Sequence, residues 1–143
     1  MKTKHQRLTN KTYDLLRKTT PFCNIDVIIK KDNKFLLGKR IIKPYAGLWS
    51  VPGGRIRKGE KIIDAITRIT NEEVTILVGK PKLIGVYEGL SKYRHDISLT
   101  YLVNYLDGTP QADHQHSVFQ WFYKIPNNTI SFQKQALKDA LFS

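Results

Sequence analysis

The sequence predicts a single α/β domain in which helices pack on a mixed β-sheet. Three observations predict this fold class. The chain has 143 residues, enough for one domain with its own hydrophobic core. Several short runs of aliphatic and β-branched residues have the pattern of strands, and amphipathic helical segments lie between them. Apolar residues make up 41% of the chain, which is typical of a globular protein and not of a disordered one.

The first third of the chain predicts one helix and three strands. Residues 7–18 form a short amphipathic pattern that a Thr-Pro pair ends, because the residue before proline disfavours the helical conformation. The apolar runs at 23–30 and 34–40 are expected to be strands, and Lys31-Asp32-Asn33 is expected to join them as a hairpin loop. Residues 47–54, GLWSVPGG, predict another short strand that runs into a Pro-Gly-Gly turn.

The rest of the chain predicts two more helices with strands between them. Residues 60–74 have helical periodicity, and the chain closes with a second such segment at 131–142. Alternating runs at 82–90, 98–106 and 117–124 predict strands. No repeat, linker or low-complexity segment interrupts this order, so residues 1–143 are expected to form one domain.

Charge and cysteine content restrict the class of protein without selecting one. Lys and Arg number 24 against 12 Asp and Glu, a net charge of +12, which is compatible with anionic partners such as nucleotides and equally with an ordinary solvated surface. The basic residues are scattered and form no block, so a tail that binds nucleic acid is not expected. No apolar run approaches the roughly 20 residues of a membrane helix. Cys23 is the only cysteine, which excludes an internal disulfide and favours a cytoplasmic location.

The helix at 60–74 ends on two adjacent acids whose orientation differs. Successive helical residues are rotated by about 100°, so Ile62, Ile66 and Ile69 form a narrow apolar stripe. Glu73 falls in line with that stripe and Glu72 about 80° to one side. Arg68 precedes Glu72 by four residues and is expected to pair with it. Glu73 then needs another partner in the interior, and a divalent metal ion is the natural candidate.

These acids belong to a longer pattern of fixed spacings that resembles the signature of the Nudix hydrolase family. That signature runs Gly, five residues, Glu, seven residues, Arg-Glu, two residues, Glu-Glu, one residue, Gly and an aliphatic residue. The matching positions are Gly54, Glu60, Arg68, Glu72, Glu73 and Ile76. The departures are Ile69 in place of a glutamate, Thr70 in place of an aliphatic residue and Thr75 in place of a glycine.

The departures themselves are similar to one branch of that family, the GDP-mannose mannosyl hydrolases. That branch also has an Arg-aliphatic-Thr run in the helix, and residues 20–60 are similar to it nearly throughout. It has a Gln-His pair before an aromatic strand, as Gln115-His116 stands here before SVFQWF. The resemblance covers about residues 20–125. It implies an α/β/α sandwich, with a mixed β-sheet and helices packed on both faces.

The resemblance also implies a cofactor and its ligands. A Mg²⁺ ion, with Mn²⁺ as a possible substitute, is expected to bind the backbone carbonyl of Gly53, the carboxylate of Glu73 and the amide of Gln115. Glu60 and Glu72 are candidates for a further ligand or for contacts with the outer shell of the metal. This set has a single net negative charge, which leaves the cation free to neutralise the diphosphate of a nucleotide sugar.

Four further residues obtain roles in catalysis and substrate binding from the resemblance. Arg40 and Arg55 are expected to bind the diphosphate leaving group, since a guanidinium fork suits phosphate oxygens. Asp26 is expected to orient the sugar or an arginine, and His116 to act as the base that activates water. The implied reaction is attack of water on the anomeric carbon, giving GDP and free sugar. The branch also implies a homodimer, by analogy only.

Three hypotheses therefore remain open from the sequence. The first is hydrolysis of a nucleotide sugar, of the GDP-mannose or GDP-glucose type, at the sugar carbon. The second is a Nudix pyrophosphatase that attacks phosphorus in a nucleotide sugar or another nucleotide. The third is a non-catalytic Nudix domain that binds nucleotide or RNA through its positive surface.

Overall fold

The structure is a computed structural model, and it describes residues 7–113 and 115–142. Within these residues the chain forms eight strands and three α-helices. No helix among the described residues has the length and apolar character needed to cross a membrane. The strands are β1 (Phe22–Lys31), β2 (Lys34–Arg40), β3 (Trp49–Ser50), β4 (Gly53–Arg55), β5 (Leu77–Val78), β6 (Lys82–Leu90), β7 (His95–Asp107) and β8 (His116–Phe122). The helices are α1 (Asn10–Thr19), α2 (Ile62–Thr67), which continues into the π-helical turn η1 (Arg68–Glu73), and α3 (Ser131–Leu141).

The strands form a mixed sheet whose central strand, β1, has a divided edge. On one side β1 runs parallel to β7 from Phe22 to Lys30, while the other pairings in the sheet are antiparallel. On its other side β1 pairs with β2 only at Lys30 and Lys31, and with β4 at residues 24–26. Because β2 and β4 take different parts of this edge, β2 diverges from β1 toward its own end at Arg40.

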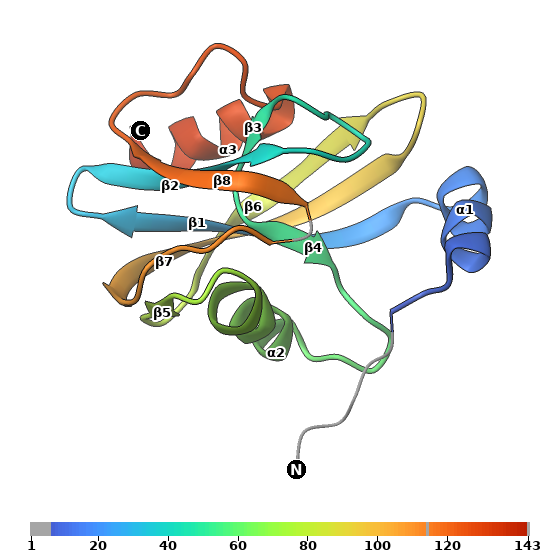
Figure 1. The fold of residues 1–143 in the computed structure, drawn as a ribbon, viewed down its shortest axis with the longest axis horizontal. Coiled ribbons are helices and arrows are strands. Elements are labelled where there is room, and N and C mark those ends of the chain that lie inside the picture. Colours follow the sequence, from blue (N-terminus) through green and yellow to red (C-terminus); the bar gives the residue numbers. More distant parts are fainter. Residues whose placement is uncertain (1–6, 114, 143) are drawn as a thin grey trace.

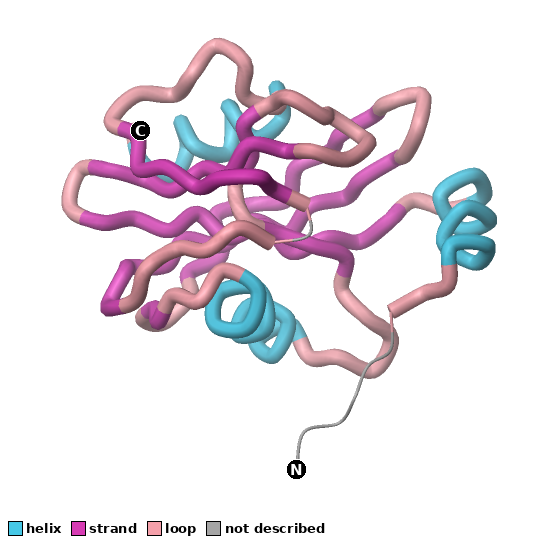
Figure 2. Tube along the Cα trace, viewed as in Figure 1, coloured by secondary structure: helices cyan, strands magenta, loops and turns pink. Residues whose placement is uncertain are grey.

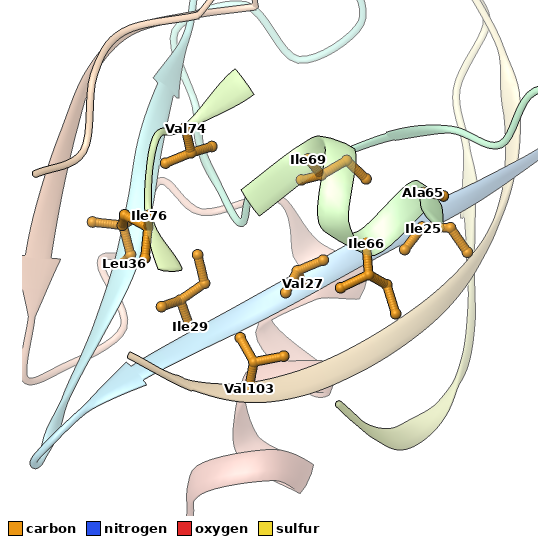
Figure 3. Close-up of a cluster of buried hydrophobic side chains, with 10 residues drawn as sticks. All are labelled: Ile25, Val27, Ile29, Leu36, Ala65, Ile66, Ile69, Val74, Ile76 and Val103. Atoms are coloured by element: carbon orange, nitrogen blue, oxygen red, sulfur yellow. The ribbon is translucent and has the colours of Figure 1, made fainter. Parts of the chain in front are cut away.

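Helices cover both faces of the sheet, as the resemblance implies. Figure 1 shows α2 and α3 on opposite sides of the strands, and Figure 2 shows the same layers with α1 apart at the edge of the molecule. Side chains of β1 alternate between the two faces. Ile25, Val27 and Ile29 pack with α2 in the cluster of Figure 3. Ile28 packs on the other face in a cluster that contains Leu137 of α3. The fold class predicted from the sequence is therefore confirmed.

Two elements differ from those predicted. The expected strand at 47–54 is two short strands, because β3 pairs with β2 while β4 pairs with β1. The strand β5 was not predicted, since two residues give too short a pattern to recognise. The other predicted helices and strands are present within a few residues of their expected ends.

The predicted helix at 60–74 changes its geometry at Arg68, and this changes which acid faces the arginine. Ile66 and Ile69 are buried as expected, whereas Ile62 is 39% exposed, so the apolar stripe begins later than the helical wheel indicated. In η1 the Val74 N–H donates to the Ile69 carbonyl five residues back (3.1 Å), as in a π-helix. This wider turn brings Arg68 next to Glu73. The expected pairing of Arg68 with Glu72, based on α-helical spacing, is therefore replaced by a pairing with Glu73.

Candidate functional site

A cavity of about 340 Å³ lies where β2 diverges from β1, and it is lined by residues from distant parts of the sequence. Most of the residues selected from the sequence line it: Asp26, Arg40, Gly53, Arg55, Glu73 and Gln115. Six arginines and three acids of the described residues face this space, which gives it an excess of positive charge; the arginines are Arg7, Arg40, Arg55, Arg57, Arg68 and Arg94. Such a cavity suits a ligand with several negative charges.

Three residues that carry candidate oxygen ligands line the cavity from separate segments of the chain. Glu73 ends η1, Gly53 begins β4, and Gln115 directly precedes β8. Burial raises the pKa of the Glu73 carboxyl, and the nearby Asp113 raises it further, while Arg68 opposes both effects. A carboxylate whose charge is disfavoured by burial and by a second acid gains from a nearby cation.

Gly53 is required at its position because of a close approach to β1. A Cβ atom at residue 53 would lie 2.1 Å from Oδ1 of Asp26 and 2.8 Å from the backbone oxygen of Ile25. Asp26 itself is buried, and Ser98 of β7 donates a hydrogen bond to its Oδ2. Burial raises the pKa of Asp26 to about 6, despite that hydrogen bond.

Arg40 is buried at the end of β2 and connects Gln115 to the loop that follows β2. Its Nε donates to the carbonyl of Pro44 (2.7 Å), and its Nη1 donates to Oε1 of Gln115 (3.2 Å). Burial and the nearby Arg94 lower the pKa of Arg40. A guanidinium carries five N–H donors, so Arg40 has donors left for a ligand in addition to these contacts.

Arg68 joins Glu60 and Glu73 and is itself almost buried. Its Nε and Nη2 donate to the two carboxylate oxygens of Glu60 (2.8 and 3.0 Å), and its Nη1 donates to Oε1 of Glu73 (3.0 Å). A further bond from Nη2 reaches the carbonyl of Arg55 (3.2 Å). Glu60 also accepts from the backbone N–H of Arg57, so it fixes the loop before α2 and does not line the cavity. Glu72 is exposed and also lies outside the cavity lining.

The structure does not bring His116, the expected base, to the cavity. Its side chain is 1% exposed, and both ring nitrogens have partners. Nδ1 lies 2.8 Å from Oδ1 of Asp113, and Nε2 lies 2.7 Å from Oγ of Ser50. The assignment of His116 as a base that contacts the attacking water thus conflicts with this geometry, because the resemblance identifies a residue type and not its surroundings.

The cavity also contains a polar cluster around Asp96 that was not predicted from the sequence. Asp96 of β7 is buried and accepts from Arg94 (2.7 Å) and from Asn24 of β1 (2.7 Å), and Arg94 also donates to the Tyr13 hydroxyl of α1 (2.9 Å). The signal that could have found it is the alternation of polar residues at 96, 98 and 100 in a predicted strand. Parallel pairing of β7 with β1 places these polar residues beside Asn24 and Asp26.

The residues that line the cavity carry oxygen ligands of the types that suit a hard divalent cation with few protein ligands. Carboxylate, amide and carbonyl oxygens are the ligand types that Mg²⁺ and Mn²⁺ accept. The described residues contain no cluster of three or more His, Cys, Asp or Glu that could hold a metal on their own. A cation here would therefore depend on Glu73 together with neutral oxygens, and it would keep positions for a phosphate ligand and for water.

Comparisons with known proteins agree with this architecture. The family model of the NUDIX domain matches residues 23–136. The chain is 32% identical to the "ADP-ribose pyrophosphatase" of Methanocaldococcus jannaschii over 118 residues, 80% of this chain and 70% of that protein. It is 27% identical to the "Low-salt glycan biosynthesis protein Agl8" of Haloferax volcanii, over 81% of this chain and 80% of that protein.

A solved structure gives the same result. The MutT NUDIX hydrolase from Burkholderia pseudomallei superposes with a TM-score of 0.77 at 26% identity, covering 84% of this chain and 98% of that one.

Proposed function

Because the chain belongs to the Nudix hydrolase family, we propose that it hydrolyses a nucleoside diphosphate sugar with the help of a divalent cation, Mg²⁺ or Mn²⁺. One observation carries this proposal. Glu73, Gln115 and Gly53, which are far apart in the sequence, line the same arginine-rich cavity. Its volume of about 340 Å³ is within the usual range for ligand pockets, roughly 300–1,000 Å³.

Nudix hydrolases use divalent metals, and in this chain Gly53, Glu73 and Gln115 would hold the cation. When bound, such a cation neutralises part of the charge on the diphosphate oxygens. Arg40 and Arg55 lie in the same cavity and would bind the diphosphate as it leaves, since guanidinium groups stabilise developing negative charge. Asp26, which lines the cavity next to Gly53, would accept hydrogen bonds from sugar hydroxyls or orient an arginine.

We propose that the bond broken in this reaction is the one between the anomeric carbon and the diphosphate oxygen. Ile69 occupies the position of a glutamate in the family signature, and its side chain is fully buried in the core. The helix therefore supplies the cavity with one carboxylate, from Glu73, which suits one cation that acts on the leaving group. Water attack at carbon would release a nucleoside diphosphate and a free sugar, with GDP-mannose or GDP-glucose as the candidate substrates.

Attack at phosphorus is the second candidate, and a relative's name favours it. The relative with 32% identity is named an ADP-ribose pyrophosphatase. ADP-ribose also contains a nucleoside diphosphate joined to a sugar, but through the C5 oxygen of the sugar and not through its anomeric carbon. The name of the Haloferax protein refers to glycan biosynthesis, which is compatible with a nucleotide-sugar substrate. Both candidates act on a nucleoside diphosphate joined to a sugar, but only attack at carbon needs that link to be at the anomeric carbon.

Product analysis in ¹⁸O-labelled water separates the two candidates. The purified protein would be incubated with GDP-mannose, GDP-glucose and ADP-ribose, with Mg²⁺ or Mn²⁺. Attack at the anomeric carbon is possible only for the two GDP sugars; it gives a nucleoside diphosphate and places ¹⁸O in the sugar. Attack at phosphorus is possible for all three and gives a nucleoside monophosphate, with ¹⁸O in phosphate. Nucleotide binding without cation-dependent turnover of any of the three would refute both and support a non-catalytic domain. A homodimer belongs to this proposal by resemblance alone, and light scattering during gel filtration tests it.

A further inference from the structure

Ser50, His116 and Asp113 form a continuous chain of buried hydrogen bonds that no step of the proposed reaction uses. Oδ1 of Asp113 accepts from the backbone N–H of Gln115 (2.9 Å), from the backbone N–H of His116 (2.8 Å) and from Nδ1 of His116 (2.8 Å). The opposite ring nitrogen, Nε2, lies 2.7 Å from Oγ of Ser50. We call these three side chains the brace.

The direction of the hydrogen bonds follows from the partners. A carboxylate oxygen that already accepts two backbone N–H groups is an acceptor, so Nδ1 of His116 carries the proton and donates it to Asp113. In the neutral ring Nε2 is the acceptor, and the Ser50 hydroxyl donates to it.

The brace resembles a serine nucleophile with its histidine and aspartate, but its surroundings differ from such a site. Ser50 and His116 are each 1% exposed. The backbone N–H of Val51, next to the serine, donates to Oε1 of Gln133 (2.8 Å) and is not free to stabilise an oxyanion. The arrangement is therefore one that holds side chains in place.

The brace connects two of the segments that line the cavity. Asp113 and His116 flank Gln115, and Ser50 on β3 precedes Gly53 by three residues. The carbonyl of Gln115 also accepts from the N–H of Ile41 (2.9 Å), which fixes the same segment to the end of β2. We propose that Ser50, His116 and Asp113 are positioning residues that fix Gln115 relative to Gly53 and thereby set the affinity of the cavity for a divalent cation.

This inference rests on the proposed function, and it assigns His116 a role different from that of a general base. Partners that orient metal ligands typically change metal affinity by about 10–100-fold when they are removed. A general base instead contributes roughly 10²–10⁴-fold to the rate and nothing to metal affinity. Binding and rate therefore separate the two roles.

The experiment measures Mn²⁺ binding to the purified full chain without substrate, by the electron paramagnetic resonance signal of free Mn²⁺, and then kcat against pH at saturating Mn²⁺. The variants are Ser50→Ala, His116→Gln, Asp113→Ala and Asp113→Asn. Ser117→Ala, an exposed serine next to His116, is the matched control. Circular dichroism checks that each variant is folded, and Ser50→Ala removes only one hydroxyl group.

We expect Ser50→Ala, His116→Gln and Asp113→Ala to weaken Mn²⁺ binding by about 10–100-fold, with kcat at saturating Mn²⁺ and its pH profile close to those of the wild type. Asp113→Asn keeps the accepting oxygen and should restore most of the affinity. Unchanged Mn²⁺ affinity in Ser50→Ala, or a loss of kcat in His116→Gln with normal affinity, would overturn the brace and leave the proposed function intact. A wild-type protein that does not bind Mn²⁺ would instead refute the cation site of the proposed function.

Discussion

The ion pair between Arg68 and Glu60 allows a quantitative prediction about stability. The variant Arg68→Met keeps the length of the side chain and its apolar packing but removes every hydrogen bond that the guanidinium makes. Glu60 would then lose both of its bonds from Arg68, which span 2.8 and 3.0 Å, and would keep only the bond from the backbone of Arg57. Because the Glu60 side chain is 3% exposed, water cannot replace the lost donors without a change in the fold.

The expected loss of stability follows from this burial. Removing one partner of a buried ion pair costs about 3–5 kcal/mol, whereas an exposed pair contributes only about 0–1 kcal/mol. The pKa of Glu60 has a definite sign as well: burial alone would raise it, but the bonds from Arg68 hold it below its ordinary value. A carboxyl group with a lowered pKa stabilises the fold above its unfolded-state pKa, and this contribution is lost as the pH falls through the folded-state value. The penalty of Arg68→Met should therefore shrink in acid.

Urea unfolding of the wild type and Arg68→Met, followed by tryptophan fluorescence at neutral and acidic pH, measures this effect. Lys61→Met, on the exposed surface at the start of α2, is the control and should change the unfolding free energy by less than about 0.5 kcal/mol. A loss below about 1 kcal/mol in Arg68→Met at neutral pH would show that the pair is solvated, and it would refute the reasoning from burial.

Three further predictions concern the cavity. Gly53→Ala should destabilise the fold by about 1–3 kcal/mol and reduce activity, because its Cβ would meet Asp26 at 2.1 Å, whereas Gly54→Ala, with its nearest contact at 4.0 Å, should be tolerated; equal effects in urea unfolding would contradict the close approach. The pKa of Asp26 is raised from 3.8 to about 6, so its buried charge lowers the stability of the fold as the pH rises through that interval. Between about pH 4 and pH 8, the unfolding free energy of Asp26→Asn should therefore rise by about 3 kcal/mol relative to that of the wild type. Paired unfolding curves measure this difference, and a difference that stays constant with pH would exclude the shift. Arg55→Met should raise KM for the nucleotide sugar by roughly 10–100-fold in steady-state kinetics, while Lys58→Met, exposed in the loop that follows β4, should not; a similar KM for both variants would show that Arg55 does not bind the diphosphate.

The sequence predicted the fold and one part of the cavity because both depend on local patterns. Strand and helix periodicity give the layers, and the spacing from Gly54 to Glu73 specifies one loop and helix. Gln115 was found only because the resemblance connects it with that helix. Its position against the helix depends on the pairing of β8 with β2, which local pattern does not determine.

The features that were missed depend on long-range register or on a change in helix type. Asp96 meets Asn24 across 72 positions, and only the parallel pairing of β7 with β1 brings them together. The π-helical turn exchanges Glu72 for Glu73 beside Arg68, which a wheel with α-helical spacing cannot show. The burial of His116 likewise follows from tertiary contacts with Ser50 and Asp113.

The central claim is that Glu73, and not its neighbour Glu72, binds the divalent cation on which hydrolysis depends. A Mn²⁺ titration of the wild type, Glu73→Gln and Glu72→Gln tests it most directly. We predict that Glu73→Gln weakens Mn²⁺ binding by at least about 100-fold, because loss of a direct ligand should cost more than loss of an outer-shell partner. Glu72→Gln should bind Mn²⁺ as the wild type does. Loss of binding in Glu72→Gln with normal binding in Glu73→Gln would contradict the account.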